Sequence, residues 1–545
     1  MEALPGLAWH RPRAAPMDPE SAARPYRGVP QDFESRPLFD LLRSAAALDP
    51  DALALVDGRD RISYRDLLRH VRLAARALGD GGGPVAVLMP NTPAGLAAVL
   101  GCLVARRIVL LLDAQQPAER NALILSDAGA TALVCAADAP ALPVAGLPRI
   151  AIASLFAGTD DPAWEPPAAF GPHDPAIVFF TSGSTGRPKG IVRPLWSLLY
   201  RSRVAIDGIH LGPADRMLNA SQTTTDASVA RYLAILCTGG RIVLYQPNID
   251  GLAALRERLI AEAVTFLVAG PALMRVALSL PGMQDAFATL RDWTCGGAAV
   301  LRADLDAARG IMPAACVFRT TYASTEAGVV ASWAIPRDLD GHGPRVPSGW
   351  LRAGMEVALL DASQGVGELV VRGPGVALGE WQEGRCVPGR MPADPEHAGW
   401  RVFRTGDLVR IGDDGLLHFV SRVDQQIKVK GVRIEPAEIE AVLRRVAGVT
   451  DAVVMARTVA EHAGSEETVL VAHVAAAGDR AAVLEALREH LRLALPSVMR
   501  PSQIEVHDRL PRMAGGKVDL RALAQHAQAG LVRRTLSAIL PRRGR

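Results

Sequence analysis

The sequence predicts an α/β protein, with a large N-terminal domain of mostly parallel sheets covered by helices and a small α+β domain towards the C-terminal end. Two observations predict this class. Between residues 63 and 136, helical segments alternate with strand-like segments that are continuously apolar, which is typical of parallel strands buried on both faces. After about residue 405, hairpin-like and short strand-like segments replace this alternation.

The segment 63–79 predicts the first long helix. Ser63 and Asp66 have the spacing of a capping box, apolar residues recur on one face, and Gly79 stands where the helix should end. The following segments predict strands at 84–89, 108–113 and 130–136, with helices between them at 94–105 and 117–129. This order is that of repeated strand–helix–strand units.

In the C-terminal part, residues 408–420 predict a hairpin, because Asp414 and Gly415 form a favoured turn pair. Further strands are expected at 426–434, 451–456 and 468–476, with helices from Pro436 and at 481–495. We therefore expect a flexible leader (1–35), a large domain (36–421), a hinge (422–426), a small domain (427–525) and a basic tail (526–545).

Composition narrows the class of protein. Of the 545 residues, 49% are hydrophobic and 21% are charged, and the net charge is +3, so we expect neither a nucleic-acid nor a membrane partner. The longest apolar stretch, 95–105, is too short to cross a bilayer. The six cysteines form no Cys-x-x-Cys pair, which predicts reduced thiols in a cytoplasmic protein rather than a zinc site or disulfides.

A run of small polar residues, Thr181 to Gly190, follows the apolar strand-like segment 176–180. Glycine allows successive backbone N–H groups to converge on an anion, hydroxyls add donors, and Lys189 adds charge, so the run predicts a phosphate site. A flexible surface loop is the alternative. Because Pro188 stands where the glycine before the lysine is required, the run does not match a kinase or GTPase phosphate loop.

The sequence TSGSTGRPKG of this run resembles the phosphate loop of the adenylate-forming superfamily, which includes acyl-CoA synthetases, luciferases and the adenylation domains of nonribosomal peptide synthetases. Four further blocks resemble motifs of that family in the same order: an adenine-side motif (320–328), a ribose motif (403–408), a hinge block (421–440) and a last motif (510–520). The resemblance covers about residues 37–522. It implies a mobile small domain with Asp424 in its hinge, and it implies ATP and Mg²⁺ as cofactors.

The resemblance assigns roles to single residues. Lys517 would contact both the substrate carboxylate and the α-phosphate and offset their repulsion, whereas its alternative is a solvated surface lysine. Thr325 would donate to the α-phosphate, and Glu326 would hold Mg²⁺. Tyr322 would stack on adenine, Asp407 would accept both ribose hydroxyls, and Arg422 would contact ribose or phosphate. The other residues implied to bind the nucleotide are Thr181, Ser182, Gly183, Ser184, Thr185, Gly186, Lys189, Gly297, Ala323 and Ser324. For Tyr322 and Asp407 the alternatives are a core tyrosine and a turn aspartate.

The segment 223–245 resembles the FDASVWE segment of amino-acid-activating domains, with Thr225 in place of phenylalanine. Asp226 would then bind the substrate's α-ammonium, and its alternative is a helix cap. By position, the remaining pocket residues would be Ala227, Ala230, Val268, Trp293, Cys295, Thr321, Val329 and Val330. Apart from Asp226 and Lys517 this lining is uncharged, so we expect a neutral, small to medium, mostly apolar amino acid.

The partners follow from what the sequence lacks. It has no segment that resembles a carrier protein, and it ends about 25 residues after the last motif, so we expect a free-standing enzyme that loads the phosphopantetheine thiol of a separate carrier protein. The alternatives are an acyl- or aryl-CoA ligase that uses free coenzyme A, and a nucleotide-binding scaffold without catalysis. The sequence leaves open whether the protein is a monomer or a dimer.

Overall fold

The computed structural model describes residues 7–11, 17–24, 26, 28–144, 146–182, 187–339, 343, 345–423, 427–429, 432–460, 466–476, 478–511, 518–520 and 522–523. The chain divides into two compact units. The larger is built mainly from the described parts of 1–181 and 188–425, and the smaller from those after residue 433. The expected fold class, a large α/β domain followed by a small α+β domain, is confirmed.

One sheet of the larger unit has eight strands in the order β19-β18-β8-β7-β4-β3-β5-β6. Its centre is parallel, with β3 paired to β4 and β5, and β4 paired to β7. These strands have the bounds β3 (Val85–Met89), β4 (Val109–Asp113), β5 (Ala132–Cys135), β6 (Arg149–Ala151), β7 (Pro175–Thr181), β8 (Lys189–Pro194), β18 (Gly379–Gln382) and β19 (Arg385–Val387). The predicted strands 84–89, 108–113 and 130–136 are confirmed as β3, β4 and β5.

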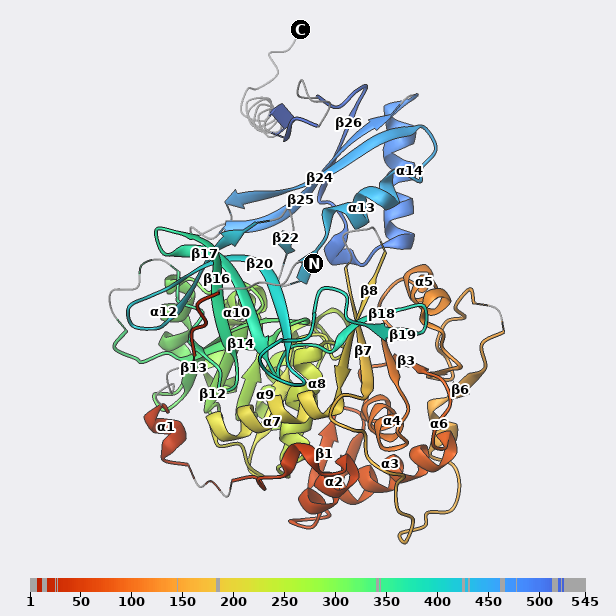
Figure 1. The fold of residues 1–545 in the computed structure, drawn as a ribbon, viewed down its shortest axis with the longest axis vertical. Helices are drawn as coiled ribbons and strands as arrows, with labels where there is room; N and C mark the ends of the chain where they lie inside the picture. The colour runs from red at the N-terminus through yellow and green to blue at the C-terminus, as the bar shows by residue number, and fades with distance from the viewer. Residues whose placement is uncertain are drawn as a thin grey trace. The chain divides into compact units, whose positions relative to one another are not determined.

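Helices α3 (Tyr64–Leu78), α4 (Pro93–Val104) and α5 (Ala118–Ala128) connect the first strands, as expected (Figure 1). The Ser63 hydroxyl caps α3 by accepting a hydrogen bond from the Asp66 backbone N–H at 3.1 Å. Helix α4 is buried around nearly its whole circumference, which is typical of a helix inside a large core. A Cβ at Gly101 would lie 2.4 Å from the Ala74 Cβ, so α3 and α4 pack closely only because glycine stands there.

A second sheet has nine strands, in the order β15-β14-β13-β12-β11-β9-β10-β1-β2. Six neighbouring strands are parallel: β1, β10, β9, β11, β12 and β13. The bounds are β1 (Leu53–Val56), β2 (Arg61–Ser63), β9 (Arg216–Asn219), β10 (Arg241–Leu244), β11 (Phe266–Val268), β12 (Asp292–Gly296), β13 (Val317–Ser324), β14 (Gly328–Ala334) and β15 (Trp350–Leu351). Helices α7 (Leu195–Ile209) and α8 (Asp226–Leu236) pack against each other in this part of the unit (Figure 1).

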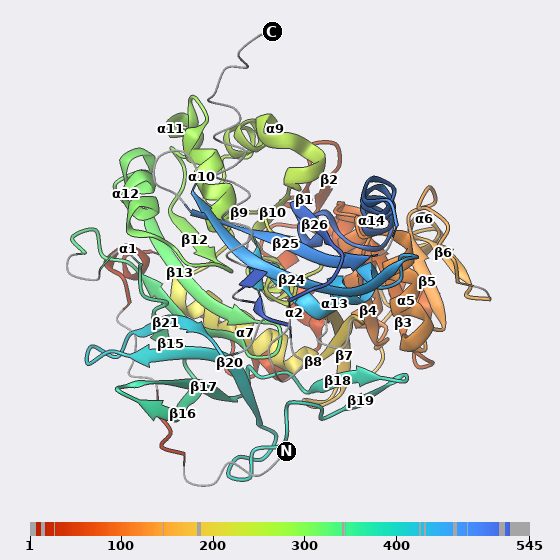
Figure 2. The same ribbon diagram turned by 90° about the horizontal axis from the view of Figure 1, so that it is seen from above.

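A third, antiparallel sheet of the larger unit was not predicted as a sheet. It has the order β16-β17-β20-β21, with bounds β16 (Glu356–Ser363), β17 (Val366–Gly373), β20 (Arg401–Ile411) and β21 (Leu417–Arg422). The four strands lie side by side in Figure 2. The predicted hairpin is confirmed as β20 and β21, and Gly415 in its turn has a φ of 84°, a value that favours glycine.

The N-terminal residues differ from the flexible leader expected for 1–35. Among those described, Phe33 is 1% exposed in the core, and the Asp18 carboxylate pairs with Arg319 at 3.1 Å. The guanidinium of Arg372 lies 4.1 Å from the ring centroid of Trp9. The proline and arginine content suggested a loose segment, whereas Trp9, Asp18 and Phe33 contact residues that are distant in sequence.

The smaller unit contains the three-stranded sheet β24-β25-β26, helix α13 (Pro436–Leu443) and helix α14 (Arg480–Ala494). Strands β24 (Val449–Ala460) and β25 (Glu466–Ala476) are antiparallel, and β26 (Gln503–His507) is parallel to β25. The predicted short strands of the hinge block are β22 (Ile427–Val429) and β23 (Val432–Ile434). In the part of the chain that the structure describes, no helix is long and apolar enough to cross a membrane.

Candidate active site

Three of the predicted nucleotide-binding residues form one buried cluster in the larger unit. The Tyr322 hydroxyl on β13 donates to Oδ2 of Asp407, and Arg422 donates to Oδ1 of the same carboxylate. Asp407 and Arg422 are cross-strand partners on β20 and β21. Burial, and then the Asp407 charge, raises the pKa of Tyr322 well above its ordinary value, so this hydroxyl remains a donor. The structure thus brings together the residues expected at the adenine and ribose ends of a nucleotide.

The turn between β13 and β14 holds Thr325 and Glu326. Gly328 follows with a φ of 71°, and a Cβ there would meet the Gly375 carbonyl oxygen at 2.9 Å, so the turn requires glycine. The Ser324 hydroxyl accepts a hydrogen bond from the backbone N–H of residue 327 at 3.0 Å. The turn is therefore closed by a side chain.

Four charged side chains connect this turn to the strand that follows the glycine-rich run. Lys189 on β8 pairs with Glu380 on β18. Arg390 lies 3.1 Å from Oε1 of Glu326 and 3.7 Å from Oε1 of Glu380. Burial lowers the pKa of Lys189, and the Glu380 hydrogen bond opposes this. Sequence reasoning missed Glu380 and Arg390, because neither stands in a motif that the resemblance covers.

Several predicted residues cannot be placed. Gly183, Ser184, Thr185 and Gly186 of the glycine-rich run, Lys517 and Asp424 all lie outside the described residues. The Thr181 hydroxyl donates to the Lys189 carbonyl oxygen at 3.4 Å. Gly297, after β12, has a φ of 85°, and Ser182 is partly buried. The roles of these residues stay predictions.

Asp226 is 2% exposed and is held by two arginines. Arg201 Nη1 donates to its two carboxylate oxygens at 2.6 and 2.7 Å, and Arg193 Nε lies 3.1 Å from Oδ1. The helix-cap alternative is wrong, because the Thr225 hydroxyl caps α8 by accepting from the Ser228 N–H at 3.2 Å. The carboxylate expected to meet a substrate ammonium thus already has two cationic partners inside the protein.

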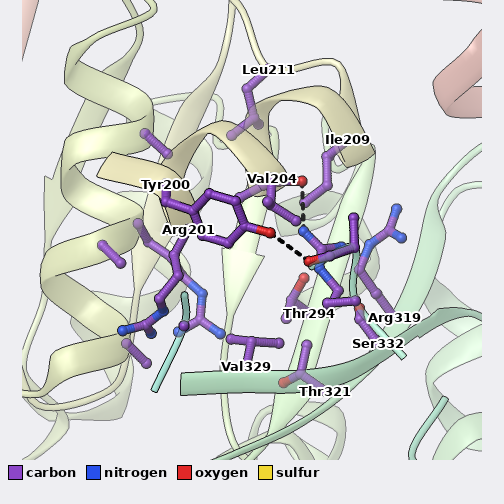
Figure 3. A pocket seen from close by; sticks show the side chains of 18 of the residues that line it. Tyr200, Arg201, Val204, Ile209, Leu211, Thr294, Arg319, Thr321, Val329 and Ser332 are labelled. Carbon is purple, nitrogen blue, oxygen red and sulfur yellow. Dashed lines mark hydrogen bonds between the residues drawn. The ribbon is translucent and has the colours of Figure 1, made fainter. Parts of the chain in front are cut away.

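A cavity lies between α7, α8 and the nine-stranded sheet (Figure 3). Its volume is about 70 Å³, several times what one water molecule requires. Of the predicted pocket residues, four line it: Ala227, Ala230, Thr321 and Val329. Tyr200 and Val204 of α7 face Thr294 and Thr321 of the strands across it (Figure 3).

Four other predicted pocket residues belong to the core instead: Val268, Trp293, Cys295 and Val330. Trp293 and Cys295 are 0% exposed, and the Trp293 ring lies 4.9 Å from that of Phe287. On β12 it is Thr294 that lines the cavity. Because side chains alternate along a strand, an assignment that is one residue off selects the wrong face. The expectation for Trp293 and Cys295 is therefore wrong for this cavity.

The expectation of an uncharged lining is also wrong. Four arginines line the cavity: Arg201, Arg231, Arg319 and Arg352. The four arginines come from α7, α8, β13 and the residue after β15. The family resemblance names none of them as a pocket residue, so they were missed. Their spacing in sequence gives no signal that would have grouped them.

The comparisons with known proteins agree with this geometry. The AMP-binding enzyme family matches residues 42–381, and the AMP-binding enzyme C-terminal domain matches residues 438–517. The chain belongs to the AMP-binding enzyme family. It is an adenylate-forming ligase by family, and its resemblance to nonribosomal peptide synthetase adenylation enzymes is confirmed.

Two curated relatives illustrate the similarity. Isonitrile lipopeptide synthase of Streptomyces coeruleorubidus is 35% identical over 92% of this chain and 34% of its own length. The probable non-canonical nonribosomal peptide synthetase CymA of Salinispora arenicola is 34% identical over 90% of this chain and 6% of its own length. This AMP-binding enzyme therefore spans about a third, or less, of these relatives.

Solved structures show the same fold. An artificially fused adenylation–PCP di-domain from Klebsiella oxytoca has a TM-score of 0.75 and 21% identity, and the match covers 92% of this chain and 97% of that one. A malonyl-CoA ligase with methylmalonyl-CoA and AMP bound has a TM-score of 0.73 and 25% identity, over 87% and 100% of the two chains.

The residues of this AMP-binding enzyme fit a nucleotide and a magnesium ion. The Asp407 carboxylate accepts two hydrogen bonds from side chains, and a carboxylate has acceptor capacity for about four, which leaves room for ribose hydroxyls. Glu326 is a buried carboxylate beside the turn, and Mg²⁺ needs only one or two carboxylates besides phosphate oxygens. Arg390 donates a hydrogen bond to the Glu326 carboxylate. If Mg²⁺ bound this carboxylate instead, Arg390 would be released toward the phosphates.

The smaller unit contains a histidine group that sequence reasoning missed. Nδ1 of His473 lies 3.1 Å from Nε2 of His507 and 3.3 Å from a carboxylate oxygen of Glu505. Such a set can hold a metal ion by its geometry. The signal was the alternation on β26, which places Glu505 and His507 on one face beside β25.

Proposed function

We propose that this enzyme activates a carboxylic acid with ATP as an acyl-adenylate, releases pyrophosphate, and passes the acyl group to the phosphopantetheine thiol of a separate carrier protein. The observation that carries the proposal is the cluster of Tyr322, Asp407 and Arg422 in the larger unit. Tyr322 and Asp407 stand 85 positions apart in the sequence and meet there, and Arg422 joins them from the strand paired with β20; the family resemblance implies a nucleotide contact for all three, which supports the proposal.

The chain's own residues would divide the first step between them. Asp407 would hold the ribose, while the Tyr322 hydroxyl and Arg422 orient its carboxylate. Arg390 and Lys189 lie beside Glu326 and Glu380 and would offset phosphate charge as pyrophosphate leaves. Bound Mg²⁺ would polarise the phosphates from the Glu326 side. Lys517 would neutralise the carboxylate and the α-phosphate as they meet.

An amino acid remains the first substrate class to test, because the relatives are peptide synthetases. The Asp226 geometry supports it less than the sequence did. A substrate ammonium at Asp226 would have to share that carboxylate with Arg193 and Arg201, and like charges at such short range repel. Acids without an α-amine are therefore the second class, and free coenzyme A is the second acceptor.

Exchange of labelled pyrophosphate into ATP tests this proposal directly. We expect exchange that depends on an added acid, when the common amino acids and their deaminated counterparts are screened in parallel. Thioester formed on a phosphopantetheinylated carrier protein, compared with free coenzyme A, identifies the acceptor. A protein that binds ATP in a thermal-shift assay yet catalyses no exchange with any acid would favour the scaffold and overturn the proposal.

A further inference from the structure

The cavity in the larger unit has cationic walls. Among its described lining residues there is no acidic side chain, and four are arginines. Two of these are compensated by carboxylates, since Arg201 pairs with Asp226 at 2.6 Å and Arg319 pairs with Asp292 at 3.0 Å. Arg231 and Arg352 differ from them, and they decide what the cavity can bind.

Arg231 lies on α8, four residues after Ala227, so both residues share the helix face that lines the cavity. Within the described part of the chain it forms no ion pair and donates no hydrogen bond. The pKa of Arg231 is lowered to about 10, mainly by burial and then by the charge of Arg201. Tyr232, Asp226 and Asp292 act in the opposite direction, but the two carboxylates are beyond ion-pair distance.

Arg352 follows β15 and reaches the cavity from the sheet side. Its Nη2 donates to the Val204 carbonyl oxygen at 2.6 Å, one of the hydrogen bonds drawn in Figure 3. No carboxylate of the described residues lies within ion-pair distance of it. The pKa of Arg352 is lowered to about 10, mainly by burial and then by the charges of Arg319 and Arg231, while Tyr200 and Asp207 oppose this shift. Most of its N–H donors are thus left for another acceptor.

Arg231 and Arg352 are partly buried. A partly desolvated guanidinium without a counter-ion is costly, and a bound anion reduces this cost. The planar N–H donors of arginine fit a carboxylate in a bidentate manner. The rest of the wall is largely apolar and includes Ile209, Leu211 and Val329. Such a wall fits the hydrocarbon part of a small ligand.

We propose that the acid activated by this enzyme carries a second carboxylate, and that Arg231 and Arg352 bind this group in the cavity. The inference rests on the proposed function, because it names the substrate class of the same enzyme. It replaces the neutral amino acid expected from the sequence with a dicarboxylic acid, whether or not that acid also carries an amine.

The test is pyrophosphate exchange with matched pairs of acids on the full chain. The pairs are succinate and butyrate, glutarate and pentanoate, L-aspartate and L-asparagine, and L-glutamate and L-glutamine. In at least one pair we expect kcat/KM for the dicarboxylate to exceed that of its neutral partner by about 100-fold, which corresponds to about 2.7 kcal/mol. Equal or better exchange with the neutral acid in every pair overturns the inference and leaves the proposed function standing. No exchange with any acid overturns both.

Two variants connect the preference to the arginines. In Arg231→Met we expect the 100-fold ratio to fall to about unity through a rise in KM for the dicarboxylate, while Arg231→Lys keeps part of it. Arg352→Met should act in the same direction. The control is Arg65→Met, because Arg65 is 63% exposed and pairs with the exposed Asp51; it should keep the wild-type ratio.

A binding measurement separates recognition from a structural role. The preferred dicarboxylate should raise the melting temperature of the wild type and of Arg65→Met, but not that of Arg231→Met. Arg231→Met without ligand should be at least as stable as the wild type, since the change removes a partly buried charge that forms no ion pair within the described residues. An Arg231→Met enzyme that keeps both the ratio and the ligand-induced shift would refute the assignment.

Discussion

Replacing Asp226 with asparagine tests the interpretation of the buried charge cluster. In the wild type this carboxylate contacts Arg193, whose side chain is 0% exposed, and Arg201, whose side chain is 7% exposed. The amide of asparagine has nearly the same shape but no charge, so two buried guanidinium groups would lose their counter-ion. Removing one partner of a buried pair costs about 3–5 kcal/mol.

The expected shift in melting temperature follows from the size of the larger unit. Its roughly 420 residues imply an unfolding entropy near 0.9 kcal/mol/K, so a loss of 3–5 kcal/mol lowers the melting temperature by about 3–6 °C. Differential scanning calorimetry measures this directly. The matched control is Asp51→Asn at the exposed Arg65 pair, where a surface ion pair contributes about 1 kcal/mol or less and the shift should stay within about 1 °C.

A second substitution makes the test sharper. Because Arg201→Met removes one of the two orphaned charges, the double variant with Asp226→Asn should lose less stability than the sum of the two single variants. If Asp226→Asn melts with the wild type, or if the two changes are simply additive, then Asp226 does not serve as the counter-ion of these arginines. The Asp226 carboxylate would then again be a candidate partner for a substrate ammonium group.

Three further predictions concern the nucleotide cluster, the core and the cysteines. Tyr322→Phe keeps the ring but removes a hydrogen bond to the Asp407 carboxylate, so KM for ATP should rise about tenfold, and an unchanged KM for ATP in steady-state exchange would contradict the cluster's role. Gly101→Ala should lower the melting temperature by about 1–3 °C, since its Cβ would lie 2.4 Å from that of Ala74. Adding Ala74→Gly to this variant should restore the melting temperature. The control Gly310→Ala should not lower the melting temperature, because no atom lies within 4 Å of the added Cβ. Burial raises the pKa of Cys102 and Cys316 to about 12 and that of Cys386 to about 11. Iodoacetamide at pH 8 should therefore modify the native protein far more slowly than the six thiols of the urea-unfolded chain. A thiol of the native protein that reacts fast would argue against this burial.

The elements predicted correctly share a local signal. Helix α3 could be predicted because Ser63, its apolar face and Gly79 all lie within one segment. Strands β3, β4 and β5 could be predicted because parallel strands buried on both faces are continuously apolar. Asp414 and Gly415 form a favoured turn pair between β20 and β21. No such pair stands between β16 and β17, so these two antiparallel strands were missed.

For the candidate site, motif residues were predictable and their surroundings were not. Tyr322, Asp407 and Arg422 stand in motifs that the resemblance covers, and the structure brings them together. Trp293 and Cys295 were assigned to the cavity by position, whereas the pairing of β12 with its neighbours turns them toward the core. A strand's two faces are equivalent in the sequence until its neighbours are known.

The sequence by itself therefore determined the class of fold, the family and the order of the nucleotide motifs, because each depends on residues close together along the chain. Only the tertiary structure decided the charge of the cavity. Asp226 meets Arg193 and Arg201, which stand 33 and 25 positions away along the sequence, and the cavity arginines come from separate parts of the chain. An electrostatic field depends on distances in space, and these are set only when the elements pack.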